Sequence, residues 1–386
     1  MRTFLLAAPL LVLLLFSFAI PILTLLARAV YDPVIADALP RTSLVIGEWD
    51  GMGIPDDPVL TALAGDLVAA EAAGSVTLLA KSLNARLPGA RSQIIKTARR
   101  LAGAGDGDPA QILRSIPFWG RTDTWAAIEA GTSRFTSFYL LSAFDLRKTP
   151  EGAIASVPPT QAVFVQVFVR TFTIAGIVTL ATLILGFPLA YLIANAPKGL
   201  AMILIVTVLL PFWVSVLVRT AAWTVLLQKF GLINDFLLWL GAVSDRLDLM
   251  YSRLGLILAM THIQLPFTLL PIYSVMRTIP PSQLRAAYSL GGRPLTSFRR
   301  VYLPQVFPGV IAGCLLTFIL CLGYYITPAL VGGPGDQLIS NIIANYVNID
   351  LNWEMAAALS LVLLASTLVL FGLAARLIGL NRLKMV

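Results

Sequence analysis

Charged side chains are scarce in this sequence. Asp, Glu, Lys and Arg make up 12% of its 386 residues, whereas 58% of the residues are hydrophobic and the mean hydropathy is +0.83. Soluble domains carry about 25% charged residues. A soluble chain of this length would form two or three domains, and these charges are too few to cover their surfaces. The composition argues against a soluble enzyme and predicts a surface that largely faces lipid.

Cysteine and histidine are almost absent. Cys314 and Cys321 lie in one uncharged run; on a helix they would be about 10 Å apart, beyond the ~7 Å limit between disulfide-bonded Cα atoms. We interpret both as small core residues. His262 is the only histidine, so mechanisms that need several histidines from this chain are excluded. No zinc or redox motif is present, so we expect neither a metal nor a cofactor in this chain.

Long apolar runs dominate the rest of the sequence. Crossing a bilayer takes about 20 helical residues, and six uncharged runs are long enough: 3–27, 171–197, 199–218, 254–276, 301–326 and 355–375. The alternative for the first run is a secretory signal peptide. The run is longer than the usual ~7–15 apolar residues of a signal peptide, and Ala27-Arg28-Ala29 is a poor cleavage site. We therefore expect an all-α polytopic membrane protein with six transmembrane helices.

The basic residues favour one orientation. With a cytoplasmic N-terminus, the cytoplasmic segments contain ten basic residues and no acid: Arg2, Lys198, Arg277, Arg285, Arg293, Arg299, Arg300, Arg376, Arg382 and Lys384. Cytoplasmic loops are enriched in Lys and Arg, so both termini are predicted to be cytoplasmic. The net charge of +8 then reflects orientation, and no nucleic-acid partner is needed to explain it.

A long segment separates the first two runs. Residues 31–160 have nearly balanced charge and several Pro- and Gly-containing turn signals, and they follow a first span at 1–30 and precede a core of five spans at 161–386. Apolar residues recur every three or four positions in Val59–Ala73 and Ile94–Leu101, which predicts short amphipathic helices. We expect an extracytoplasmic, mainly helical insertion of about 130 residues. A loosely ordered linker is the alternative, and the Leu, Ile, Phe and Trp content argues against it.

The longest cytoplasmic loop has the pattern of two short helices at 282–300. Pro280-Pro281-Ser282 predicts a helix start with Ser282 as N-cap, and Gly291-Gly292 predicts its end. Leu284, Ala287 and Leu290 would share one side of this helix. Pro294 begins the second helix, and Leu303-Pro304 leads into the next span. Such a pair cannot bury its own apolar side, so it needs a partner surface.

This loop resembles the signature of inner-membrane permease subunits of binding-protein-dependent ATP-binding-cassette (ABC) importers, which is Glu-Ala-Ala, three residues, Gly, nine residues and Ile-x-Leu-Pro. The matching positions are Ala286, Ala287, Gly291 and Val301-Tyr302-Leu303-Pro304. The resemblance implies that these helices dock into a cleft of a separate ATPase. It makes Arg285, Ala286, Ala287, Gly291, Leu303 and Pro304 the coupling residues. Arg285 replaces the usual glutamate, which puts that one ion pair in doubt; a cation facing solvent or lipid headgroups is the alternative.

Other segments resemble the spermidine/putrescine-type permeases and extend the likeness over residues 165–386. These segments are 186–191, 210–213, 218–220 with Trp223, 231–234 and 323–334. The resemblance implies a bacterial inner-membrane, multi-pass transport subunit that is not an enzyme. Its implied partners are a second permease, an ABC ATPase dimer and a soluble extracytoplasmic substrate-binding protein. ATP and Mg would bind the ATPase, because this chain lacks a Gly-x-x-x-x-Gly-Lys-Ser/Thr phosphate loop.

A polyamine would be met by carboxylates and aromatic faces along its path. No acid lies inside a predicted span, and the candidates near the outer mouth are Phe212, Trp213, Trp223, Tyr324, Tyr325 and Asp336. This pattern predicts a weak gate, with affinity residing in the binding protein. The alternatives are an aromatic belt at the lipid interface and a solvated Asp336. His262 and Gln264 would either bridge helices or break one beside the pore, and Gly309-x-x-x-Gly313 fits a helix contact.

Three rival functions stay open. An importer of the same type for ferric iron, a phosphonate, an opine or an amino-acid derivative would share the same core signature. A membrane enzyme would need nucleophiles or metal ligands near the spans, which one histidine and no intramembrane acid disfavour. A receptor that senses a ligand through the insertion is disfavoured by the coupling signature.

Overall fold

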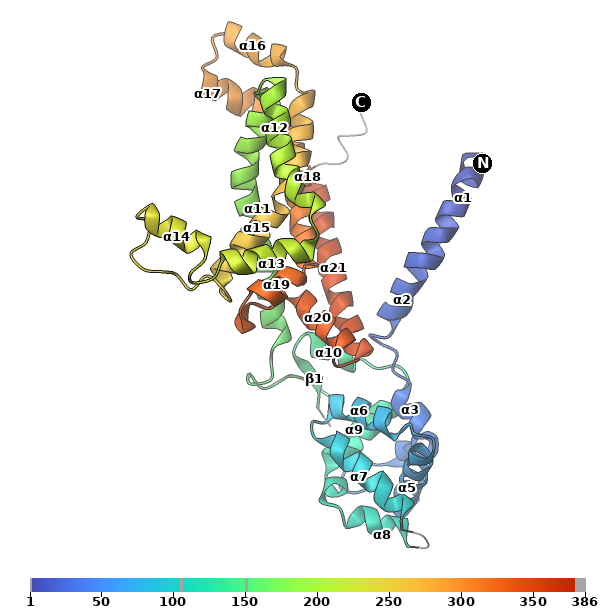
Figure 1. The fold of residues 1–386 in the computed structure, drawn as a ribbon. Helices are drawn as coiled ribbons and strands as arrows, with labels where there is room; N and C mark the ends of the chain where they lie inside the picture. The colour runs from blue at the N-terminus through green and yellow to red at the C-terminus, as the bar shows by residue number, and fades with distance from the viewer. Residues whose placement is uncertain (1, 105–106, 150–151, 379–386) are drawn as a thin grey trace. The chain divides into compact units, whose positions relative to one another are not determined.

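The computed structural model describes residues 2–104, 107–149 and 152–378. The chain divides into two compact units. The first comprises Met1–Ala162 and Asn352–Val362, and the second comprises Val163–Leu351 and Leu363–Val386. Nearly all elements are helices, as the apolar runs predict (Figure 1).

The first unit opens with the first apolar run. It forms α1 (Arg2–Leu14), a π-helical segment η1 (Leu15–Ala19) and α2 (Ile20–Ala27). The part Ala8–Ala27 is long and apolar enough to span a membrane, and none of its side chains is buried inside the protein. Without protein contacts, these apolar side chains need lipid around them.

Short helices make up the insertion. They are α3 (Val34–Ala38), α4 (Pro40–Val45), η2 (Ile46–Glu48), α5 (Asp57–Ala72), α6 (Val76–Arg86), α7 (Ala90–Ala102), α8 (Pro109–Arg114), η3 (Pro117–Gly120), α9 (Thr122–Thr132) and α10 (Phe138–Ala143). Two strands, β1 (Leu146–Lys148) and β2 (Ile154–Ser156), pair antiparallel with Leu146 opposite Ser156. The predicted helices at 59–73 and 94–101 are confirmed by α5 and α7.

The insertion has a hydrophobic core of its own. Buried Leu, Ile, Val and Ala side chains from α3 to α9 surround Trp119 and Trp125. The polar edges of both indoles are satisfied, because Trp119 Nε1 donates to Thr97 Oγ1 at 3.0 Å and Trp125 Nε1 donates to the Trp119 carbonyl at 2.8 Å. Such burial is what a segment folded in water requires. A loosely ordered linker would not have it.

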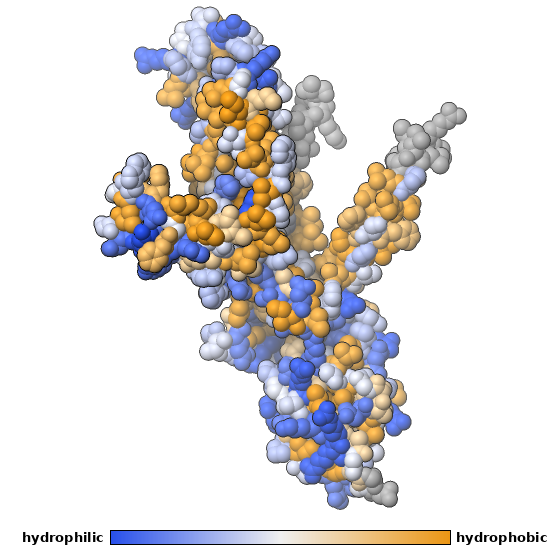
Figure 2. All heavy atoms as spheres, in the orientation of Figure 1, coloured by the Kyte–Doolittle hydropathy of each residue, from blue (hydrophilic) through white to orange (hydrophobic). Residues whose placement is uncertain are grey.

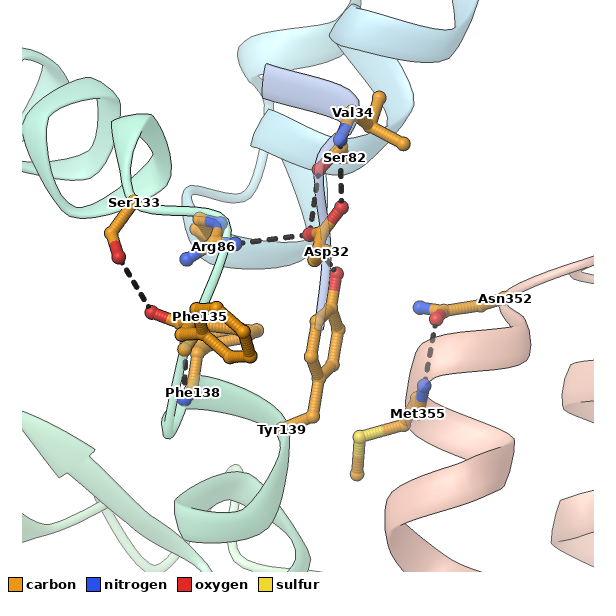
Figure 3. A network of polar contacts seen from close by, with 11 residues as sticks. Asp32, Val34, Ser82, Arg86, Ser133, Phe135, Phe138, Tyr139, Asn352 and Met355 are labelled. Atoms are coloured by element: carbon orange, nitrogen blue, oxygen red, sulfur yellow. Dashed lines mark hydrogen bonds and ion pairs between the residues drawn. The ribbon is translucent and has the colours of Figure 1, made fainter. Parts of the chain in front are cut away.

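A buried charge joins the start of the insertion to its later helices (Figure 3). Asp32 is almost fully buried and accepts hydrogen bonds from Arg86 Nη2 at 3.0 Å, Tyr139 Oη at 2.8 Å and Ser82 Oγ at 3.3 Å. The other carboxylate oxygen accepts from the Val34 backbone at 3.2 Å. Burial and the neighbouring Asp32 carboxylate raise the pKa of the Tyr139 phenol, which keeps its proton available to this bond. The carboxylate is therefore fully hydrogen-bonded despite its burial.

The second unit holds the longer helices. They are α11 (Phe164–Asn195), α12 (Lys198–Leu209), η4 (Leu210–Trp213), α13 (Val216–Leu226), α14 (Leu232–Trp239), α15 (Arg253–Thr278), α16 (Pro281–Ser289), α17 (Pro294–Ser297), η5 (Phe298–Tyr302), α18 (Leu303–Leu322), α19 (Ile326–Val331), η6 (Pro334–Asp336) and α20 (Ile339–Asn348). The last helix, α21 (Trp353–Ile378), begins in the first unit and ends in the second.

Five helices of the described residues are long and apolar enough to cross a membrane: Ala8–Ala27, Phe164–Asn195, Arg253–Thr278, Pro294–Leu322 and Trp353–Arg376. The predicted run 199–218 is not one straight helix. Lys198–Trp213 and Val216–Leu226 meet at a bend of 100°. Pro211 lies in the 3-10 turn η4, and Ser215 has φ −51° and ψ 142°, so the α-helix cannot continue through this segment. The last span also starts earlier than predicted and so includes Glu354.

Helices α11, α15 and α18 form the centre of the second unit and approach one another closely. A Cβ added to Gly313 would lie 2.5 Å from the Thr268 carbonyl oxygen, and one on Gly309 would lie 2.9 Å from Val275. The predicted contact at Gly309-x-x-x-Gly313 is confirmed. Thr268 Oγ1 lies 2.8 Å from Thr182 Oγ1 and 2.6 Å from Thr317 Oγ1, so hydroxyls link all three helices. Small residues and buried hydroxyls hold this bundle together.

Apolar side chains cover the outside of these helices. Exposed Leu, Ile, Val and Phe side chains run along α11, α12, α18 and α21, and the face drawn in Figure 2 is orange along α11 and α12. The insertion shows a mixed polar and apolar surface in the same view. The outer surface of the second unit is therefore suited to lipid.

Candidate functional site

The predicted coupling segment forms the two helices α16 and α17. Helix α16 begins at Pro281, and its N-cap is Pro280, whose side chain makes no capping hydrogen bond. The prediction of Ser282 as N-cap is wrong because proline already occupies the first helical position, where its fixed φ and missing N–H are favourable. Ser282 instead lies exposed in the first turn.

The end of α16 depends on Gly291. This residue has a φ of +81° and donates its N–H to the Tyr288 carbonyl at 3.0 Å. The Gly292 N–H donates to the Ala287 carbonyl, also at 3.0 Å. These two bonds form a Schellman motif, which needs a left-handed residue at the position of Gly291. A Cβ at Gly292 would lie 2.5 Å from Ser297 Oγ, so the second glycine permits the turn to close on α17.

The apolar residues predicted to share one side of α16 differ in burial. Leu284 is partly buried and packs against the cluster that contains Ile193, Met276 and Tyr302, whereas Leu290 caps the helix and is 89% exposed. Leu284 therefore holds α16 to the bundle, and Leu290 lies just past the last residue of the helix. Leu290 is thus uncovered at the end of α16, and Leu295 at the start of α17 is 79% exposed.

Arginines precede and follow these exposed leucines in the sequence. Arg285, Arg293, Arg299 and Arg300 are all exposed, and none of them forms an ion pair within the part of the chain that the structure describes. Ala286 is exposed and Ala287 is partly buried. Helix α17 continues through η5 into α18, so Pro294–Leu322 forms one candidate span that includes the partly buried Leu303 and the exposed Pro304. Any force on α17 is thereby applied directly to a span.

Three of the six residues predicted for the substrate path lie around the bend after α12. Phe212 and Trp213 are in η4, and Trp223 is in α13. The Phe212 ring lies 5.2 Å from the Phe267 ring of α15. Trp223 Nε1 donates to His262 Nδ1 of α15 at 3.2 Å. The interpretation of His262 as a residue that bridges helices is confirmed.

Arg219 was not among the predicted path residues, yet it lies beside Phe212. Its guanidinium carbon is 5.7 Å from the centre of the Phe212 ring. Its Nε atom is buried and has no hydrogen-bond partner among the described residues, as is also true of Gln264 Oε1, Thr261 Oγ1 and Tyr324 Oη. An arginine inside an otherwise apolar run was the available signal, since such residues mark functional positions.

The other three predicted path residues lie after α18. Tyr324 and Tyr325 use their carbonyls to accept hydrogen bonds from Ser340 Oγ at 2.7 Å and Asn341 Nδ2 at 2.8 Å. Asp336 is mostly buried and pairs with Arg253 Nε at 2.8 Å. Within the described residues, no hydrogen bond or ring contact joins Asp336 to the five aromatic candidates. Asp336 therefore anchors the start of α15 to the segment after α19.

Several known proteins are similar to more than half of this chain. The family described as "Binding-protein-dependent transport system inner membrane component" matches residues 154–379. The inner membrane ABC transporter permease protein YdcU of Escherichia coli is 38% identical over 248 residues, which cover 60% of this chain and 78% of that protein. The spermidine/putrescine transport system permease protein PotB of Escherichia coli is 34% identical over 201 residues, or 52% of this chain and 73% of that protein.

Among solved structures, a bacterial alginate ABC transporter in complex with a periplasmic protein aligns with 58% of this chain and 80% of its own chain, at 19% identity and a TM-score of 0.47. The family match covers more than half of the chain and includes the coupling segment, the bend after α12 and the aromatic residues on both sides of it. The chain therefore belongs to the inner-membrane component family of binding-protein-dependent transport systems and is the permease of an ABC importer.

Proposed function

We propose that this chain is one of two permease subunits of an ATP-driven importer for a polyamine, such as spermidine or putrescine, or for a related small cation. The 34% identity to a spermidine/putrescine permease supports the substrate class. A separate ATPase dimer binds ATP and Mg, and a soluble extracytoplasmic protein binds the solute and delivers it.

The proposed topology has six spans, with the bent pair α12 and α13 counted as the third. Both termini are cytoplasmic, and residues 31–160 form an insertion on the opposite side. The ten basic residues and no acid of the proposed cytoplasmic segments support this orientation. It also puts α16 and α17 on the same side as the ATPase.

The observation that carries the proposal is the uncovered end of α16. Leu290 and Leu295 are exposed next to a left-handed glycine turn, and the second helix continues into a span. Exposed leucines of this kind are typical of a surface that another protein covers. In the proposed mechanism, closure of the ATPase dimer around ATP pushes on Gln283–Arg300, tilts Pro294–Leu322 and alternates access to the path.

Gly291→Asp tests this coupling. The φ of +81° disfavours any side chain by about 1–2 kcal/mol, and the carboxylate adds charge to the docking surface. We expect the loss of uptake and of substrate-stimulated ATPase activity in the complete transporter, with normal membrane insertion. Gly199→Asp is the matched control, because Gly199 is exposed, belongs to the same predicted face and has open space at its Cβ position. Wild-type coupling in the Gly291 variant would contradict the proposal.

The path residues need a test that separates structure from transport. Asp336→Asn breaks the pair with Arg253, and so does Arg253→Gln. If Asp336 meets the solute, only Asp336→Asn raises the KM for uptake of radiolabelled putrescine; if the pair is purely structural, both variants have the same effect. Retention of full uptake in both Asp336→Asn and Tyr325→Ala would contradict the proposed path.

A second candidate substrate class follows from Arg219. Its cation lies beside Phe212 with no acidic partner among the described residues, and such a charge opposes the passage of a polycation. A solute with an anionic group, such as a phosphonate or an amino-acid derivative, would pair with it. Calorimetry on the cognate binding protein with putrescine, spermidine and aminoethylphosphonate decides between the two classes. For an anionic solute, Arg219→Gln is expected to reduce uptake.

A further inference from the structure

The segment between α13 and α15 carries a short helix, α14, whose inner side is firmly held. Asn234 is fully buried; its Nδ2 donates to the Leu247 carbonyl at 2.9 Å and to the Gln228 carbonyl at 3.2 Å, and its Oδ1 accepts from the Leu247 N–H at 2.9 Å. Ile233 packs against a small cluster that includes Leu227 and Leu249. The rotation of α14 about its own axis is therefore fixed.

The outer side of α14 is apolar and uncovered. Leu232, Phe236, Trp239 and Leu240 are 69%, 56%, 80% and 61% exposed. Their spacing of four, three and one residues puts them within an arc of about 100° on a helix. The Phe236 and Trp239 rings lie 5.9 Å apart. In Figure 1, α14 projects to the side of the helices of its own unit.

Four charges beside this stripe are paired with one another. Asp235, at its edge, lies 2.8 Å from Arg246 Nη1, and Lys229 lies 3.2 Å from Asp248. The Arg246 guanidinium also covers the Phe230 ring at 4.9 Å. None of these charges lies inside the arc. Whatever covers the stripe is consequently bound through apolar contact rather than through net charge.

The size of the stripe favours lipid over a protein partner. Four large side chains exposed to this degree present roughly 500 Å², whereas a stable subunit interface buries about 800 Å² on each partner. A Trp and a Phe on one face of a short amphipathic helix are typical of the membrane–water boundary. Helix α14 follows α13, the helix after the 100° bend, and belongs to a unit whose long helices are themselves apolar on the outside.

We propose that α14 is an interfacial helix whose stripe of Leu232, Phe236, Trp239 and Leu240 inserts into the boundary between the headgroups and acyl chains of the bilayer. The paired charges at its edge face water. Asn234 binds α14 to Leu247 in the loop that precedes α15. The lipid contact of α14 therefore helps to hold the bent segment that carries Trp223 and Arg219 in place.

The test uses the complete transporter reconstituted in phosphatidylcholine vesicles. Cys314→Ala and Cys321→Ala remove the native thiols, and Trp239→Cys then carries an environment-sensitive fluorophore. We expect strong quenching by phosphatidylcholine brominated near the headgroup end of the acyl chain and weaker quenching by lipid brominated near the methyl end. Asp245→Cys, exposed in the same segment, is the matched control and should not be quenched.

Two results would overturn the proposal. The first is a label at position 239 that is quenched no more than the label at position 245, which would mean that water or another subunit covers the stripe. The second is quenching at position 239 that requires phosphatidylglycerol in the vesicles, because an apolar contact with paired charges at its edge should not depend on anionic lipid. Uptake measured on the same vesicles checks that the labelled proteins are folded.

Discussion

The insertion and the permease core solve opposite packing problems within one chain. The insertion buries its Trp and Leu side chains and exposes most of its charges, whereas the core brings its helices together at Gly residues and buried Thr hydroxyls and exposes many Leu, Ile and Phe side chains. In water, burying apolar area drives folding. In lipid this gain is missing, so helices associate through close approach and hydrogen bonds. Large apolar side chains that are buried in the insertion are therefore also abundant on the surface of the core.

The largest effect is expected from the buried charge pair of Asp32 and Arg86 in the insertion. Asp32→Asn leaves Arg86 without its counter-ion. The Arg86 side chain is only 4% exposed, so water cannot replace the lost carboxylate charge. Removing one partner of a buried pair costs about 3–5 kcal/mol. We expect the insertion to unfold in the full-length protein at a lower temperature and to become sensitive to protease, while α11, α15 and α18 stay resistant.

Asp37→Asn is the control for this variant. Asp37 pairs with Arg134 at 2.9 Å, and both side chains are more than half exposed. Such a pair contributes about 0–1 kcal/mol. Equal protease sensitivity of the Asp32 and Asp37 variants would show that burial does not set the strength of these contacts.

Local patterns predicted much of both regions. Helices α5 and α7 follow from apolar residues at three- and four-residue spacing, because burial on one side of a helix produces that period. The turn at Gly291 also follows from the sequence, because glycine has no Cβ and so adopts the positive φ that ends this helix. In these cases the physical cause lies within a few residues.

Other features could not be predicted because they depend on distant partners or on the backbone path. Asp336 and Arg253 are separated by 83 positions, and nothing near either residue indicates their pairing. Hydropathy measures only how apolar a run is and does not depend on the backbone path. It therefore predicted one continuous span at 199–218, although the helix stops near Ser215. The environment of Arg219 arises only after α13 has turned toward α15.

A lysine on each surface tests directly whether the two regions face different solvents. Ile184 lies exposed on α11 of the core, and Leu44 lies exposed on α4 of the insertion. A charge facing the bilayer centre costs about 2.5–3.5 kcal/mol, whereas a charge at a surface facing water changes stability by about 0.5 kcal/mol or less. We expect Ile184→Lys to reduce the amount of folded protein in the membrane and Leu44→Lys to leave it unchanged. Similar yields for the two variants would contradict the comparison.

The smallest expected difference concerns two buried threonines. In the core, Thr268→Val removes the hydroxyl between Thr182 and Thr317. Such bonds between membrane helices average about 0.6 kcal/mol, because the separated helices find other partners; Thr182 also bonds to the Thr179 carbonyl at 2.9 Å. In the insertion, Thr97→Val leaves the buried Trp119 Nε1 without its acceptor.

An unsatisfied buried donor costs about 1–3 kcal/mol. Although Thr268 has two hydroxyl contacts with other helices and Thr97 has one such contact, we expect Thr97→Val to lower the unfolding temperature of its region more than Thr268→Val lowers that of the core. Thermal unfolding of the full-length protein, followed by protease resistance of each region, measures both effects. The reverse order would mean that the core depends on its hydroxyl contacts more than its close helix packing implies, and the contrast between the two regions would then rest on apolar exposure alone.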